Sequence, residues 1–367
     1  MLHHMRPGGC AQHIGGGTIS ASGSIWGQGG WRTRAAPSER EGKGLKAALY
    51  RATGAAADVI RLEEMERPEP GPGEVRVRLR LSGVNPTDWK ARTGATPRPI
   101  VDFQIPHHDG AGDIDAVGGG IPAERLGERV WVWLAAAGRP WGTAAQWTVV
   151  PSAQAVPLPA GASYELGACL GVPALTAHWC LSADGPVAGS DVLVTGGAGA
   201  VGHFAIELAR WGGARVAATV SGEAKADLAR RAGAQLVVNY RDPGAQAELK
   251  RFSSRFARIV EVNLAANLQM DLGLAGPDTV IVVYAADLED PVLPVRACMS
   301  ANLRMRFVLL YGVARPDLET AAAMVHRALV ENALTELPLV RFPLDRCADA
   351  QEAVRSGVTG KVVLEIP

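Results

Sequence analysis

Three closely spaced glycines form the pattern in this sequence that is most directly tied to chemistry. Gly197, Gly199 and Gly202 stand in the order G-x-G-x-x-G, a spacing typical of turns that bind the pyrophosphate of a dinucleotide. Gly197 is expected to allow the tight turn, Gly199 to let the pyrophosphate approach the backbone, and Gly202 to let a helix pack closely on a strand. The N–H groups of Ala200 and Val201 would then face the phosphates, where the helix dipole favours negative charge.

A strand and a helix must hold this turn in place, and the flanking residues predict both. Residues 192–194 are all apolar, which suits a parallel strand buried on both faces. This context favours a dinucleotide-binding site over a glycine turn with a purely structural role. After the turn, apolar residues recur at the spacing of one helix face, namely Val201, Phe204, Ala205 and Leu208.

The composition is that of an ordinary globular protein and excludes several classes of partner. Of 367 residues, 47% are hydrophobic and 20% are charged, and 37 Lys and Arg balance 37 Asp and Glu. No basic stripe offers a footprint for nucleic acid, and no apolar run reaches the ~18 residues that a membrane-spanning helix needs. Five cysteines without a pairing pattern indicate reduced thiols and a cytoplasmic protein; they are Cys10, Cys169, Cys180, Cys298 and Cys347.

Residues 1–44 differ from the rest of the chain. They lack sustained periodicity and the apolar segment of a signal peptide, so we expect a disordered extension. The run Glu41-Gly-Lys-Gly44 can be encoded by purine-rich codons resembling a ribosome-binding site, and a further hypothesis is therefore that translation starts at Leu45. Mass spectrometry of the protein from its own host tests this, since a mature N-terminus well before Leu45 excludes it.

The pattern from Leu45 onward is β-rich, and its short strands with Gly and Pro turns predict a small irregular barrel. Valines and leucines between residues 75 and 81 alternate with Arg76, Arg78 and Arg80, so we expect the arginines to form a solvated face rather than an anion site. Strands are predicted at 46–50, 59–63, 75–81, 113–117, 129–134 and 147–150.

A helix predicted at 166–181 leads into the glycine motif, after which strands and helices alternate. Such alternation predicts a doubly wound parallel sheet. The last strand, at 361–366, has no helix after it and is expected to return to the first, β-rich sheet. The other expected strands are 215–220, 235–239, 258–262, 279–284 and 304–310, with helices at 224–232 and 318–332.

Several stretches, in one register from Leu45 to the C-terminus, resemble a known family. They are SGVNPTDWKARTG (82–94), PHHDGAG (106–112), CLGVPALTA (169–177), the glycine motif, EVNLAANLQMDL (261–272) and TGK (359–361). They are similar to zinc-independent members of the medium-chain dehydrogenase/reductase superfamily, close to the zeta-crystallin-like NADPH:quinone oxidoreductases.

The resemblance implies an α/β fold with two domains. A GroES-like, β-rich catalytic domain would comprise residues 45–165 and 313–367, and a Rossmann domain with a doubly wound parallel sheet would comprise residues 166–312. The resemblance also places the cofactor in the cleft between the domains. It implies a homodimer paired through edge strands of the Rossmann sheet.

The second strand of the parallel sheet bears on the choice of cofactor. An NAD site places Asp or Glu at the end of this strand to bind the ribose hydroxyls, whereas here the strand is followed by Ser221, whose hydroxyl is a donor that a 2′-phosphate can use. Without the family resemblance, we would expect Lys225 to be an ordinary exposed lysine on a helix. The resemblance implies instead that Lys225 and Tyr240 bind a 2′-phosphate. We therefore expect NADPH, with Glu223 as an unfavourable neighbour unless it points to solvent.

The resemblance also allows a test for zinc. Zinc-dependent relatives use Cys, His and Cys, which fall here on Asn85, His108 and the Val172-Pro173 pair. One ligand of three cannot hold catalytic zinc, and the loop at 135–142 lacks the four cysteines of a structural site. We therefore expect no metal, and His108 as a cleft-lining or packing residue.

Without zinc, the remaining chemistry is hydride transfer from NADPH to an electron-poor acceptor such as a quinone or an enone. By resemblance, Asn85 lies near the nicotinamide, where its amide would hydrogen-bond the acceptor oxygen; otherwise it is a satisfied turn residue. Lys90 replaces a family tyrosine and either stabilises charge on the reduced acceptor or is simply exposed. The resemblance places Thr176 beside the nicotinamide ribose or amide, while Asn267 and Tyr284 follow Rossmann strands at the ligand-binding edge.

Three functions remain open from the sequence. The first is an NADPH-dependent quinone reductase, and the second is an enoyl or alkenal double-bond reductase that shares every cofactor residue. The third is a protein that binds NADPH with little turnover. Oxidation of NADPH by a panel of quinones and enones separates them.

Overall fold

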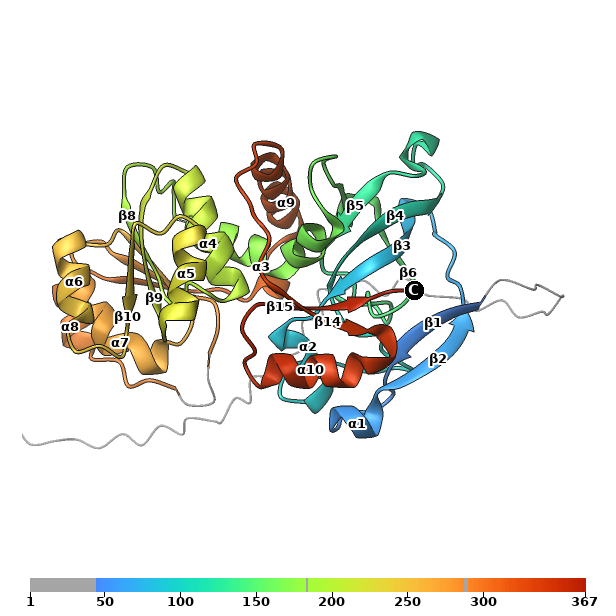
Figure 1. Cartoon of the computed structure of the whole chain (residues 1–367), viewed down its shortest axis with the longest axis horizontal. Coiled ribbons are helices and arrows are strands. Elements are labelled where there is room, and N and C mark those ends of the chain that lie inside the picture. The colour runs from blue at the N-terminus through green and yellow to red at the C-terminus, as the bar shows by residue number, and fades with distance from the viewer. Residues whose placement is uncertain (1–43, 183, 287–289) are drawn as a thin grey trace, which may run out of the picture. The chain divides into compact units, whose positions relative to one another are not determined.

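The computed structural model describes residues 44–182, 184–286 and 290–367. The expected disordered extension and the proposed internal start, apart from Gly44 and Leu45, therefore lie outside the described residues. Within the described part, the chain forms a parallel sheet and a mainly antiparallel sheet (Figure 1). None of the described helices combines the length and apolar character needed to cross a membrane.

The parallel sheet has six strands in the order β10-β9-β8-β11-β12-β13. The chain enters at the centre with β8, proceeds outward to β10, and returns to the other side of β8 with β11. This is the doubly wound order, and ligands bind where the direction reverses, outside the carboxyl ends of β8 and β11. The strands are β8 Asp191–Val194, β9 Arg215–Val220, β10 Leu236–Asn239, β11 Arg258–Glu261, β12 Val280–Val283 and β13 Arg304–Phe307.

Alternate residues of these strands supply two separate hydrophobic clusters. Val192 and Val194 pack with Phe204 of the helix that follows the glycine motif, whereas Leu193 and Ile259 pack into the other cluster. Helices therefore cover both faces of the sheet, as Figure 1 shows. They are α4 Ala200–Trp211, α5 Glu223–Arg231, α6 Ala245–Phe252 and α7 Leu264–Leu274, whereas the short α8 Val295–Ser300 has no buried residue.

The second large sheet has the order β14-β15-β3-β4-β5-β7, with β6 paired to β3. The prediction that the last strand returns to this sheet is confirmed, because β15 pairs antiparallel with β3. A separate two-stranded sheet, formed by β1 Gly44–Leu49 and β2 Arg61–Glu66, precedes this sheet in the sequence. The strands are β3 Glu74–Gly83, β4 Asp109–Val117, β5 Arg129–Val132, β6 Trp147–Pro151, β7 Ala155–Pro157, β14 Leu339–Pro343 and β15 Lys361–Glu365.

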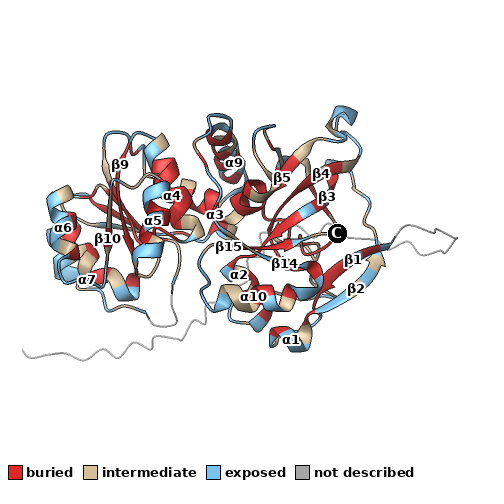
Figure 2. Cartoon of the chain, viewed as in Figure 1, coloured by how far each residue is buried: buried red, intermediate tan, exposed pale blue. Residues whose placement is uncertain are grey.

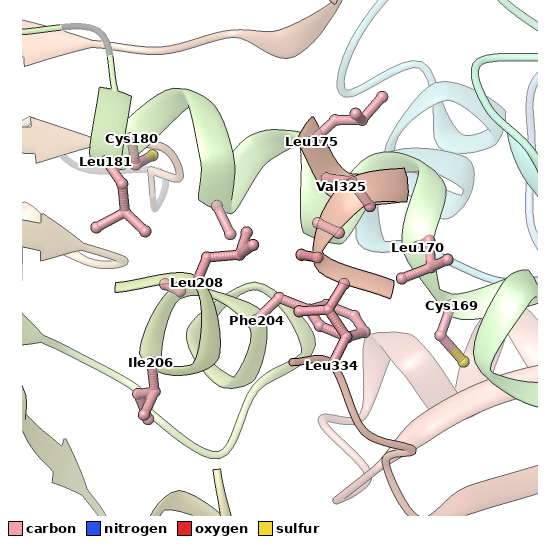
Figure 3. Packing of buried hydrophobic residues seen from close by; sticks show 14 of the residues in the cluster. Cys169, Leu170, Leu175, Cys180, Leu181, Phe204, Ile206, Leu208, Val325 and Leu334 are labelled. Carbon is pink, nitrogen blue, oxygen red and sulfur yellow. The ribbon is translucent and has the colours of Figure 1, made fainter. Parts of the chain in front are cut away.

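Helix α3 is almost entirely buried, because it packs against two other helices. Leu170 and Leu175 of α3, Phe204 of α4 and Val325 of α9 belong to one hydrophobic cluster (Figure 3). In Figure 2 the buried colour dominates α4, whereas α6 exposes much of its surface. The remaining helices are α1 Ala56–Val59, α2 Pro86–Thr93, α3 Tyr164–Ser182, α9 Arg315–Val330 and α10 Cys347–Arg355, with short turns at η1 Ala123–Arg125, η2 Ser152–Gln154, η3 Leu310–Gly312 and η4 Leu344–Arg346.

Two expectations from the sequence are corrected. The strand expected at 59–63 starts at Arg61, because residues 56–59 form the short helix α1. The solvated arginine face is wrong for Arg76, which is 6% exposed, although Arg78 and Arg80 are exposed. The Arg76 guanidinium is buried with its charge paired, at 2.8 Å from Asp115 and 2.9 Å from Glu69.

Candidate cofactor and acceptor site

The turn after β8 is built around glycines at its start. Gly196, at φ 66°, is the left-handed residue of this turn, a role the sequence assigned to Gly197. Gly197 instead continues the pairing with β9 through a hydrogen bond from its N–H to the Thr219 carbonyl (3.0 Å). A Cβ at Gly197 would lie 2.8 Å from the Cβ of Ala218, so this position needs glycine for packing.

Helix α4 begins directly at the turn with unpaired amide groups. Gly199 is the N-cap and offers no side chain to cap the helix. The first helical bond runs from the His203 N–H to the Gly199 carbonyl (2.8 Å), so the N–H groups of Ala200, Val201 and Gly202 have no partner within the helix. These groups fit an anionic ligand, which would satisfy them and complement the helix dipole.

Gly199 and Gly202 are constrained in different ways. A Cβ at Gly202 would lie 2.3 Å from the Gly196 carbonyl oxygen, so the helix could not approach the turn with a larger residue. A Cβ at Gly199 would meet that same oxygen at 3.4 Å, an ordinary contact distance, with nothing closer in the described part of the chain. The protein therefore leaves room beside Gly199, as a phosphate-binding position requires.

The end of β9 gathers the three residues expected to bind a 2′-phosphate. Ser221 follows the strand directly, and Lys225 lies half-buried on the first turn of α5. Tyr240 is held at the same end, because its N–H donates to the Val220 carbonyl (3.0 Å). Glu223 is turned to Arg230, with 2.6 Å between carboxylate and guanidinium, which removes the unfavourable neighbour that the sequence indicated.

Asn267 and Tyr284 meet at the end of β11. The Asn267 amide donates to a carboxylate oxygen of Glu261 (2.9 Å), and the Tyr284 N–H donates to the Glu261 carbonyl (3.1 Å). Both residues thus lie at the edge where a ligand of a doubly wound sheet binds. Their contact with a cofactor stays a prediction.

A second buried carboxyl group accompanies Glu261. Asp271 on α7 is fully buried, and neither of its two carboxyl oxygens meets a hydrogen-bond donor among the described residues. Burial and the neighbouring Glu261 raise the pKa of Asp271, because two adjacent carboxylates cannot both ionise cheaply in a dry site. No sequence pattern indicated that these two acids form a pair.

On the acceptor side, Asn85 belongs to a set of three buried residues that we call the buried amide network: Asn85, Asp109 and Lys361. The Asn85 amide donates to Asp109 (2.6 Å) and its oxygen accepts from the Lys361 ammonium (2.6 Å). Lys361 is also 3.6 Å from the Asp109 carboxylate. One amide hydrogen of Asn85 remains for an acceptor, so the expected contact of Asn85 with the acceptor oxygen stays a prediction.

Asp109 is next to all three positions that carry zinc ligands in zinc-dependent relatives, namely Asn85, His108 and Val172. Its carboxylate accepts from Asn85 and from the Val172 N–H (2.7 Å), and His108 precedes it in the chain. The Arg98 guanidinium lies 3.0 Å from His108 Nε2, and because a guanidinium only donates, Nδ1 carries the His108 hydrogen. Burial and Arg98 lower the pKa of His108, so this side chain is neutral.

Lys90 and Thr176 occupy different surroundings. Lys90 is half-buried on α2, with its ammonium 5.8 Å from the centre of the Trp89 ring. The Thr176 hydroxyl on α3 donates to the Val172 carbonyl (2.7 Å), which leaves its oxygen able to accept a hydrogen bond. Neither contact opposes the expected role, and both roles stay predictions.

No sequence pattern assigned a role to Asp109, Lys361, Arg98 or Arg241. The available signal for Asp109 and Lys361 was that both lie within stretches that carried the family resemblance, and the structure shows that both are buried. Lys361 reaches Asn85 across 276 residues of chain, a contact that no local pattern reveals.

Two family models match the chain. Residues 71–160 match the alcohol dehydrogenase GroES-like domain, and residues 200–327 match the zinc-binding dehydrogenase domain. A curated relative from Spinacia oleracea, a chloroplastic quinone-oxidoreductase homolog, is 31% identical over 343 residues, which are 88% of this chain and 98% of the relative. The Homo sapiens quinone oxidoreductase is 27% identical, over 84% of this chain and 94% of the relative.

Solved structures give the same picture of the fold. A structure described as an NAD-dependent alcohol dehydrogenase superposes with a TM-score of 0.79 at 26% identity, covering 88% of this chain and 100% of that one. A mycobacterial protein solved in complex with NADPH superposes with a TM-score of 0.76 at 26% identity, covering 88% of this chain and 99% of that one.

Proposed function

The chain belongs to the medium-chain dehydrogenase/reductase family, in its quinone oxidoreductase-like group, and from this premise we propose that it transfers hydride from NADPH to a quinone without zinc. The observation that carries the proposal is the uncapped start of α4 beside an end of β9 that has Ser221 in place of an acid. The first feature suits a pyrophosphate and the second a 2′-phosphate.

In this proposal the chain's own residues bind and orient a cofactor that supplies the hydride. The N–H groups of Ala200 and Val201 hold the pyrophosphate, and Lys225 and Tyr240 hold the 2′-phosphate. Asn267, Tyr284 and Thr176 would contact the nicotinamide half. Orientation is the main contribution of the protein, because the acceptor is already electron-poor.

The buried amide network supports the acceptor side of the proposal. Lys361 fixes the oxygen of Asn85 and Asp109 fixes one of its hydrogens, so the second amide hydrogen points in a single direction. We assign this hydrogen to the acceptor oxygen. Lys90 would add a positive charge that stabilises the reduced acceptor.

We further propose a homodimer that forms through the free edge of β13. This strand ends the parallel sheet, and Phe307 and Leu309 at its end are 68% and 67% exposed. Met299 on the adjacent α8 is also exposed. Paired edge strands would cover these side chains and satisfy the open backbone groups.

Turnover assays test the proposal. Purified protein is mixed with NADPH and either quinones or enones, and NADPH oxidation is followed with and without a zinc chelator. We expect quinone-dependent oxidation that the chelator leaves unchanged. Oxidation by enones alone would make the protein a double-bond reductase, tight NADPH binding without oxidation would make it a binding protein, and activity restored by zinc would contradict the zinc-free reaction.

A further inference from the structure

Arg241 lies outside every residue set that the family resemblance implied, yet its charge lies at the end of β9. It follows β10 in the chain, and its guanidinium donates to the Ser221 carbonyl (3.3 Å), 20 residues earlier in sequence. The same guanidinium lies 5.7 Å from the centre of the Tyr240 ring. Arg241 therefore contacts both Ser221 and Tyr240, two of the three residues that the sequence led us to expect around the 2′-phosphate.

The acidic groups around this position are already paired with other partners. Glu223 and Asp227 both bind Arg230, at 2.6 Å and 2.9 Å. The Asp242 carboxylate accepts from the Asn239 amide at 3.1 Å. These three acids therefore do not neutralise the positive charges of Lys225 and Arg241 at the end of β9.

Two cations at this position lack a counter-ion in the part of the chain that the structure describes. Among residues 44–182, 184–286 and 290–367, no carboxylate forms an ion pair with Lys225 or Arg241, whereas Arg230 on the same helix as Lys225 has two. Arg241 also uses only one N–H group on Ser221, and a guanidinium has five. Its remaining donors suit a phosphate monoester, which carries close to two negative charges at neutral pH.

We propose that Arg241 binds the 2′-phosphate of the adenosine and, with Lys225, determines the choice of NADPH. This inference rests on the proposed NADPH-dependent function and adds a specificity-determining residue to it. The Ser221 carbonyl holds the guanidinium at the end of β9 before the ligand arrives, so less side-chain freedom is lost on binding.

The test uses two ligands that differ in the 2′-phosphate alone. Adenosine 2′,5′-bisphosphate and adenosine 5′-monophosphate are titrated by calorimetry into the wild type, Arg241→Ala, Arg241→Lys and the matched control Arg251→Ala, which removes an exposed arginine of α6. We expect Arg241→Ala to weaken the bisphosphate by about tenfold or more and to leave the monophosphate unchanged, because only the bisphosphate carries the group that Arg241 contacts. Arg241→Lys should retain part of the affinity, and Arg251→Ala should retain all of it.

Each contrary result has a distinct meaning. Unchanged bisphosphate binding in Arg241→Ala would overturn the inference and leave the proposed function intact. Equal weakening of both ligands would also overturn it, since it assigns Arg241 to the loop structure. A wild type that binds the bisphosphate no better than the monophosphate would overturn both the inference and the choice of NADPH, whereas quinone-dependent turnover with NADH would still preserve the reaction.

Discussion

The glycine turn after β8 and the buried amide network position polar groups by opposite means. In the turn, residues 196–202 are neighbours in sequence, and their backbone N–H groups are the functional groups. In the network, Asn85, Asp109 and Lys361 come from three separate stretches, and their side chains are the functional groups. Backbone donors need only the right turn, whereas buried side-chain charges need partners that the whole fold must deliver.

This difference determines how each region should fail. Damage to the turn should remove ligand binding and leave the fold, because the amide groups point to a ligand and carry little of the core. Damage to the network should remove stability, because a buried charge that loses its partner keeps the desolvation penalty.

The largest effect is expected for Lys361→Met. The substitution leaves the fully buried Asp109 without its cation, and breaking a buried pair in this way costs about 3–5 kcal/mol of unfolding free energy. Urea unfolding measures the loss. The exposed Lys250→Met on α6 serves as the control, and Lys361→Met/Asp109→Asn should recover part of the loss. A loss below about 1 kcal/mol would contradict a structural role for the ammonium.

Gly199→Val tests the other half of the comparison. The new side chain would occupy the space beside the turn, and we expect NADPH affinity to fall by at least about a hundredfold, or ~2.7 kcal/mol, with an unchanged unfolding midpoint. Fluorescence titration and urea unfolding measure the two quantities. Gly202→Val is the matched variant and should lose stability instead, because its Cβ meets the Gly196 carbonyl. Normal NADPH binding by Gly199→Val would place the phosphates elsewhere.

Lys225→Ala separates the 2′-phosphate from the rest of the cofactor. Charge-assisted hydrogen bonds contribute about 1.5–3 kcal/mol each, so NADPH affinity should fall by about ten- to a hundredfold. NADH lacks the phosphate, and its affinity should stay the same, as should the ability to transfer hydride. Titration of wild type and variant with both cofactors measures this. Equal weakening of both would make Lys225 a structural residue.

Asp271→Asn sharpens the comparison, because the carboxyl edge of the parallel sheet also contains a buried acid. The folded pKa of Asp271 lies above its ordinary value, so the wild type loses stability as pH rises above that value towards the folded pKa. The neutral amide avoids this loss. The stability difference in favour of Asp271→Asn should grow by about 1.4 kcal/mol per pH unit within that window. Thermal unfolding at several pH values measures it, and a difference independent of pH would mean that Asp271 is ionised throughout.

The sequence predicted the parallel sheet well, because most of its strands contain a short apolar run and are followed by a helix, although β13, Arg304–Phe307, alternates arginines with apolar residues and ends before the expected residue 310. β9 was predicted from Arg215 to Val220, as the structure has it. The helix α2 and the strand β14 were not predicted, since short polar segments take their structure from tertiary contacts. The same limit applied to Arg76. Its alternation with valines indicated a solvated face, but in the structure Arg76 is buried and pairs with Asp115 on the neighbouring strand β4.

The candidate site divides in the same way. Gly199 and Gly202 could be located from spacing alone, and Lys225 and Tyr240 from the family resemblance. The network around Asp109 could not, because its members meet only when distant strands pair. The proposed role of Arg241 could not be predicted either. That role depends on which neighbouring acids are already paired, and the sequence does not show such pairings.

The pairing of β15 with β3 also has a consequence for protein synthesis. All strands of the parallel sheet have been synthesised once residue 307 has been added. By contrast, β3 can pair with β15 only after residues 361–365 have left the ribosome. Until then, the nascent chain contains Asp109 without the Lys361 that neutralises it. The mainly antiparallel sheet is therefore started before the parallel sheet and finished after it, and a chain that ends before residue 361 cannot complete it.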